Sequence, residues 1–283
     1  MAHTDWSDRA FVVQTRERWP LADTVVLAIN RFRVHRTGRN SALVAHYGFL
    51  SIFPLLLVFT TILGFVLDGN VELQQRIIDS TIAQVPIIGD QLATDPTQLQ
   101  GSVPLLVFGL LTATWSGLKA FNVLQTALDD VAEVPFDTRP SLVRVRLRSL
   151  LGIGLAGGSL VAGAVLSTLA GMTGLAWTSR ILLGVGTLAL NTLVLASVYR
   201  WLCSSRPPWS AVWPGAIFGG IGFTMLQVAG STLMTRAIAH ASPIYGTFAT
   251  VIGLLFWLGL HAMISLLGAE MNGVLVVRRV RTR

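Results

Sequence analysis

Residues 150–175 read LLGIGLAGGSLVAGAVLSTLAGMTGL, a stretch of 26 residues without a charged side chain. A helix needs about 20 mainly apolar residues to cross the roughly 30 Å hydrocarbon core of a bilayer. This stretch therefore predicts a transmembrane helix, and it makes a membrane protein the first hypothesis for the whole chain.

Apolar stretches of similar length lie on both sides of this one, and together they predict an all-α, polytopic membrane bundle of six helices. The transmembrane domain covers residues 41–277, between a basic segment, 1–40, and a basic tail, 278–283. Amphipathic interfacial helices are expected in the 1–40 segment and in an outer loop, 68–102, where the helix is either a solvated cover or a gate. The six predicted spans are residues 42–67, 103–124, 150–175, 181–202, 211–234 and 248–277.

The composition agrees with a membrane protein and excludes several other classes. Hydrophobic residues make up 52% of the 283 residues and charged residues only 12%, against about 25% charged in soluble domains. These values exclude a disordered protein, a coiled coil and an ordinary cytosolic enzyme. The single cysteine, Cys203, excludes an intrachain disulfide and a cysteine-based metal cluster.

The distribution of basic residues predicts the orientation. With six spans, 17 of the 21 Lys and Arg residues fall in the segments on the side of the two termini, and three fall on the opposite side. Cytoplasmic loops carry the excess of Lys and Arg, so both termini are expected in the cytoplasm. The remaining basic residue, Lys119, lies inside the second span.

A basic cluster precedes the first span and has two interpretations. It could contact anionic lipid headgroups, which makes membrane lipids the expected partners, or it could serve only as a topology signal. Its members are Arg31, Arg33, Arg36 and Arg39.

Small residues and a proline shape the predicted spans. Gly154 and Gly158 are four residues apart, as are Gly215 and Gly219, so each pair lies on one helix face. Small faces let helices approach closely, either within one chain or in a homo-oligomer. Pro54 removes a backbone donor within the first span and is a candidate hinge.

Four ionisable residues lie at membrane depth. At about 1.5 Å rise per residue, His46, Lys119 and Glu270 fall in the inner third of the bilayer and His261 near its middle. Such residues usually face the bundle interior, a partner or a water path. We therefore expect a polar cluster with a Lys119–Glu270 pair, the alternative being side chains that extend to the interface.

Several motifs resemble those of the YihY/BrkB family of bacterial inner-membrane proteins, whose members were formerly labelled ribonuclease BN. AHYGFLSIFPL at 45–55 is similar to the first-span motif of that family, although His46 stands where a second Tyr is common. WSGLKAFN at 115–122, SPIYGTF at 242–248 and LGAEMN at 267–272 resemble its other motifs. The residues concerned in the C-terminal motifs are Ser242, Pro243, Tyr245, Gly246 and Asn272.

The resemblance implies a multi-pass protein of the bacterial inner membrane, whereas activity is poorly defined across the family. The sequence contains no Walker A loop, no HExxH and no GxSxG motif, and its histidines are dispersed. We therefore expect no enzyme activity, no cofactor, no metal site and no nucleic-acid partner. The leading hypothesis is a transporter or exporter of an amphiphilic, lipid-like substrate without its own ATPase. The alternative is a membrane scaffold or regulatory subunit with lipid- or partner-binding basic arms.

The predicted topology can be tested by cysteine labelling after Cys203 has been replaced. A cysteine introduced at Asn70 or Gln98 should react with a membrane-impermeant thiol reagent in intact cells, whereas one at Thr282 should react only after lysis. The reverse labelling pattern would exclude the orientation.

Overall fold

The computed structural model describes residues 20–66, 103–171, 177–239 and 246–281, and these ranges contain seven α-helices and no strand. The expectation of an all-α membrane protein is confirmed. A short 3-10 helix at Phe136–Thr138 lies in the connection after the third of these helices. The helices are α2 (Pro20–Val34), α3 (Thr37–Val66), α6 (Val103–Val131), α7 (Leu142–Gly171), α8 (Trp177–Trp201), α9 (Trp209–Ala239) and α10 (Gly246–Arg281).

Four segments of these helices are long and apolar enough to cross a membrane, and they fall on the last four predicted spans. The first two predicted spans fall on α3 and α6, which have 30 and 29 residues. The count of six spans stays a prediction. The outer loop and residues 242–245 of the family motif lie outside the described residues. The four segments are Val143–Gly163, Trp177–Trp201, Trp209–Gly230 and Val251–Val276.

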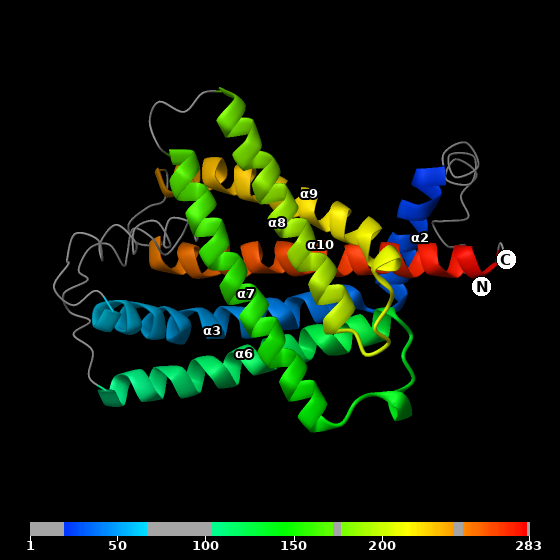
Figure 1. The fold of residues 1–283 in the computed structure, drawn as a ribbon, viewed down its shortest axis with the longest axis horizontal. Coiled ribbons are helices and arrows are strands. Elements are labelled where there is room, and N and C mark those ends of the chain that lie inside the picture. Colours follow the sequence, from blue (N-terminus) through cyan, green and yellow to red (C-terminus); the bar gives the residue numbers. More distant parts are fainter. Residues whose placement is uncertain (1–19, 67–102, 172–176, 240–245, 282–283) are drawn as a thin grey trace.

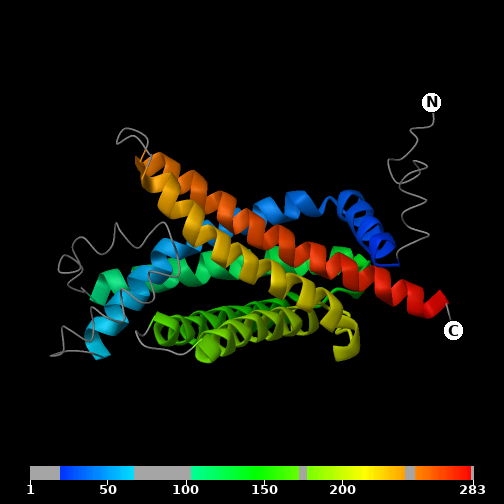
Figure 2. The same cartoon turned by 90° about the horizontal axis from the view of Figure 1, so that it is seen from above.

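Helix α10 is the centre of the arrangement. It contacts α2, α3, α6 and α9, and α3 packs beside α6 along the long axis of the molecule (Figure 1). Helices α7 and α8 form a separate layer that crosses the others obliquely (Figures 1 and 2). Buried side chains of α6, α8, α9 and α10, together with Leu202 directly after α8, form the core, which includes Leu128, Tyr199, Val212 and Leu266.

Helices α9 and α10 approach each other closely at two glycines. A Cβ atom added to Gly215 would overlap the backbone oxygen of Gly268, and one added to Gly268 would lie 2.6 Å from the oxygen of Gly215. Asn272 of α10 fits the same contact, since its Oδ1 accepts a hydrogen bond from Gly215 N at 2.7 Å and its Nδ2 donates one to Val212 O at 3.2 Å. The resemblance had marked Asn272 only as a motif residue, and the structure shows that it joins two helices.

The other glycines singled out from the sequence have different surroundings. Gly219 packs against Leu195, whereas Gly154 and Gly158 face open space with no atom near an added Cβ. The face of α7 that carries Gly154 and Gly158 is therefore not used for packing within the described part of the chain. Pro54 lies inside α3, which continues to Val66.

Replacing Gly215 by alanine should destabilise the protein, because the new methyl group overlaps backbone that cannot move aside. Overpacking of this kind costs about 1–3 kcal/mol. The matched change Gly158→Ala should have little effect, because nothing lies near that position. Thermal unfolding of both variants in detergent measures the difference, and equal midpoints would contradict the close contact.

Candidate functional site

A buried carboxylate on α10 is bound by three side chains from the α2–α3 region. The Glu270 side chain is fully buried. Its Oε1 accepts hydrogen bonds from His35 Nδ1 at 2.8 Å and Thr37 Oγ1 at 3.0 Å, and its Oε2 accepts one from Arg31 Nε at 3.3 Å. Because Nδ1 of His35 faces a carboxylate, that nitrogen carries the proton. Partners of this kind offset the desolvation of a buried charge, which otherwise costs several kcal/mol.

The corner between α2 and α3 brings these three donors together. Helix α2 ends at Val34 and α3 begins at Thr37, so only two residues separate them. Arg36 has a φ of 53°, the left-handed conformation that lets the chain turn sharply there. Arg31 in the last turn of α2 and Thr37 at the start of α3 can therefore reach one carboxylate. The positive end of the α3 dipole favours a negative charge at this place.

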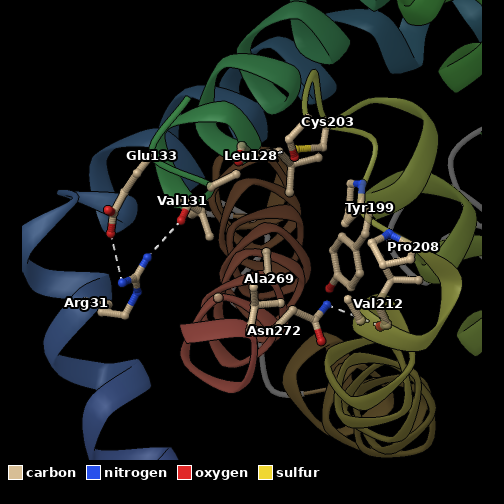
Figure 3. A pocket seen from close by; sticks show the side chains of 16 residues that line it. Arg31, Leu128, Val131, Glu133, Tyr199, Cys203, Pro208, Val212, Ala269 and Asn272 are labelled. Carbon is tan, nitrogen blue, oxygen red and sulfur yellow. Dashed lines mark hydrogen bonds and ion pairs between the residues drawn. The ribbon is translucent and has the colours of Figure 1, made fainter. Parts of the chain in front are cut away.

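Arg31 also binds the end of α6. Its Nη2 donates to Val131 O at 3.0 Å, and its Nη1 lies 2.9 Å from Glu133 Oε1. The Glu133 side chain is 62% exposed, in contrast to Glu270. One guanidinium thus connects α2, α6 and α10, as Figure 3 shows for its contacts with α6.

The other carboxylates at the end of α6 have their own partners. Asp129 is buried and accepts two hydrogen bonds from Ser204, one from the backbone N and one from Oγ, both at 2.7 Å. Asp130 pairs with Arg139 Nη2 at 2.7 Å. Acidic groups at a helix C-terminus oppose the helix dipole, so these partners offset an unfavourable position. No group of three His, Cys, Asp or Glu residues in the described ranges is placed to hold a metal ion.

The prediction of a Lys119–Glu270 pair was wrong. Lys119 is exposed, and no hydrogen bond or ion pair of the described residues joins it to Glu270, whose partners are Arg31, His35 and Thr37. Rise per residue gives the height of a side chain along a helix but not the direction in which it points. A lysine within a span can extend its long side chain towards the interface, so its burial in the bundle is not required.

The two other members of the expected cluster also lie apart from Glu270. His46 is exposed and its ring contacts Tyr47. His261 Nδ1 bonds Trp257 O at 2.9 Å, and its ring packs against Phe223. Their contacts are local ones, within a helix or with its neighbour.

Of the four arginines expected to contact lipid, Arg31 has a different role. Its side chain is only 22% exposed, and its guanidinium nitrogens contact Glu270, the Val131 carbonyl and Glu133 within the protein. Arg33, Arg36 and Arg39 are exposed. The signal that could have identified the true partner of Glu270 is the grouping of Arg31, His35 and Thr37 within seven residues, at the same depth as Glu270.

A pocket of about 360 Å³ lies beside Arg31, between α2, α6, α10 and the turn that joins α8 to α9. Arg31 and Glu133 lie on one side of it, and Tyr199, Pro208 and Val212 on the other (Figure 3). Among the described residues that line it, Arg31 and Glu133 are the charged ones.

Most polar groups of the lining are engaged within the protein. The Tyr199 hydroxyl donates a hydrogen bond to Ser265 O at 2.6 Å. The Asn272 side chain forms hydrogen bonds with the α9 backbone through both Oδ1 and Nδ2. Burial raises the pKa of the Cys203 thiol, which stays neutral at physiological pH. The wall opposite Arg31 is therefore mainly apolar in character.

Comparison with known proteins identifies similar chains but no similar structure. A sequence profile of the family described as virulence factor BrkB matches residues 28–283. The chain is 26% identical to the "Putative ribonuclease-like protein YfkH" of Bacillus subtilis (strain 168), over 88% of this chain and 94% of the relative. It is 25% identical to the inner membrane protein YhjD of Escherichia coli (strain K12), over 88% and 80%. It is 26% identical to the UPF0761 membrane protein Mpe_A1422 of Methylibium petroleiphilum, over 93% and 65%. No solved structure matches.

Removing the buried carboxylate should destabilise the protein strongly. Glu270→Ala leaves Arg31 without its buried partner, and breaking one side of a buried pair costs about 3–5 kcal/mol. Thermal or denaturant unfolding in detergent gives the measurement.

In a double-mutant cycle, Arg31→Met and Glu270→Gln should show a coupling of about 0.5–3 kcal/mol. Lys119→Met is the control, and coupling of Lys119 to Glu270 would contradict the network.

Proposed function

The chain belongs to the virulence factor BrkB family of membrane proteins, and on this premise we propose that it transports or exports an amphiphilic, lipid-like molecule across the bacterial inner membrane. The observation that carries the proposal is the pocket at one end of the bundle, apolar on one side and charged on the other. Its volume lies within the roughly 300–1,000 Å³ range of ligand sites. An apolar wall opposite a charged group suits a molecule with an apolar chain and a polar head.

Aromatic residues next to the pocket support a position at the membrane interface. Trp201, Trp209 and Trp213 flank the α8–α9 turn, with ring centroids 6.2 and 6.5 Å apart, and each is 37–42% exposed. The Arg200 guanidinium lies 5.1 Å above the Trp209 ring. Trp is enriched where a membrane helix meets the headgroup layer. The same turn contributes Pro207 and Pro208 to the pocket, so the pocket lies where an amphiphile from the bilayer can reach it.

The proposed orientation places this end of the bundle in the cytoplasm, with six spans and both termini on that side. The excess of basic residues in the corresponding segments supports this orientation. The proposed partners are membrane lipids, and the proposal includes no catalytic step, cofactor or nucleic acid. The ribonuclease-like name of the Bacillus relative describes that protein.

A membrane scaffold or regulatory subunit is the second candidate function. The contacts of Arg31 favour it because they hold α2 in a fixed position. They fix α2 to α6 and α10, which leaves Arg33, Arg36 and Arg39 exposed at a defined place. A scaffold needs no continuous path through the membrane, whereas a transporter does. Transport measurements therefore separate the two functions.

Filling the pocket should slow transport. In proteoliposomes, the protein should accelerate the transfer of a fluorescent lysophospholipid between leaflets, followed by quenching of the outer leaflet. Ala132→Trp places a large ring in the pocket and should lower the rate by about tenfold or more, the equivalent of 1.4 kcal/mol of lost binding. Val25→Trp, on an exposed site of α2 outside the pocket lining, is the matched control. A wild-type rate equal to that of protein-free liposomes would favour the scaffold.

A further inference from the structure

The three partners of Arg31 differ in how easily they can be replaced. Glu270 is fully buried and holds Nε, and the Val131 carbonyl holds Nη2. Nη1 is held by Glu133, which is 62% exposed and lies in the pocket lining with Arg31. An exposed ion pair contributes little because water competes for both charges. The Nη1 edge of the guanidinium is therefore the part of the network that another anion can reach and occupy.

The backbone at Glu133 is unfavourable for a glutamate. Its φ is 52°, a left-handed conformation that follows the end of α6 and that glycine or asparagine adopts most readily. Its carboxylate also follows the negative end of the helix dipole, beside Asp129 and Asp130. Such backbone persists where the surrounding structure holds it, and here Val134 N donates to Asp129 O at 2.9 Å in the turn that ends α6. The Glu133 carboxylate Oε1 lies 2.9 Å from Arg31 Nη1 and 3.8 Å from His35 Nε2.

From these observations we propose that the pocket binds an amphiphile with an anionic headgroup, and that its phosphate or carboxylate replaces Glu133 on Arg31. The inference rests on the proposed function and deepens it by naming the substrate class. Glu133 occupies the headgroup position while the pocket is empty. Nη1 of the guanidinium can donate a charge-assisted hydrogen bond to a phosphate or carboxylate, and such a bond is stronger than one between neutral groups.

The rest of the pocket fits the chain of such a molecule. The lining also includes the apolar residues Leu128, Val212, Ala269 and Val276, and the polar ends of Tyr199 and Asn272 are bonded within the protein. Apolar surface that is removed from water here contributes roughly 25 cal/mol per Å², which becomes part of the affinity in addition to the headgroup contact. A small anion lacks this contribution, and a neutral amphiphile lacks the contact with Arg31.

Binding to the purified full-length protein in a nonionic detergent tests the inference. The probes are oleoyl lysophosphatidic acid, the neutral monooleoylglycerol, the cationic sphingosine and inorganic phosphate, each measured by native mass spectrometry or calorimetry. The anionic amphiphile should bind most tightly. Glu133→Gln should increase its affinity by about two- to fivefold, the equivalent of one exposed ion pair, because the competing carboxylate is gone.

Two controls separate the contact from other effects. Asp137→Asn removes the same charge from an exposed site in the same connection and should leave the affinity unchanged. Arg31→Gln should abolish the preference for the anionic over the neutral probe. Because that change leaves Glu270 with one donor fewer, the double variant Arg31→Gln/Glu270→Gln repeats the measurement in a protein without the unpaired charge.

The outcomes distinguish this inference from the proposed function. Equal affinity for the anionic and the neutral amphiphile would overturn the proposal of an anionic headgroup, as would no gain in affinity in Glu133→Gln relative to Asp137→Asn. Either result would still be compatible with a pocket that binds amphiphiles. Tighter binding of sphingosine would overturn the anionic headgroup as well. If inorganic phosphate binds as tightly as the anionic amphiphile, the Arg31 site is supported but the lipid-like substrate is not. If no probe binds, both proposals fail.

Discussion

The charge of Glu270 is the constraint on which the end of the bundle depends. A carboxylate with no exposed surface is stable only if donors surround it, and here they come from the last turn of α2, the corner and the first residue of α3. This requirement fixes the angle between α2 and α3 and holds α2 against α10. Arg31 then extends the same network to the end of α6. The polar contacts thus determine where one wall of the pocket lies.

The opposite wall depends on packing rather than charge. Gly215 and Gly268 let α9 and α10 approach until their backbones touch, and Asn272 bonds the α9 backbone across the contact. Without a hydrophobic force between helices in lipid, close packing and interhelical hydrogen bonds are what hold such helices together. The pocket lies between this rigid contact and the Arg31 network. Each wall is therefore fixed by an independent set of interactions.

The fold could be predicted from the sequence further than the site could. Apolar length is a property of a continuous segment, so the long helices and the all-α class follow from stretches such as residues 150–175. The partner of Glu270 depends on the direction in which side chains point, which height along a helix does not give, and Lys119 was therefore the wrong choice. Gly215 and Gly158 illustrate the same limit, because both are small residues in apolar helices but only Gly215 meets a neighbour.

Because Arg31 belongs to both the buried network and the pocket, occupancy of the pocket and the hold on α2 are linked thermodynamically. A ligand anion that replaces Glu133 changes the charge around the guanidinium, and with it the strength of the contact with Glu270. Linkage is reciprocal, so any condition that strengthens the α2–α10 contact in the bound state also raises the affinity of the ligand. Helix α2, which contributes Arg31 to the pocket lining, is thereby placed to respond to the occupancy of that pocket. Transport and interaction with a partner through α2 are then compatible functions of one network, since the same guanidinium takes part in both.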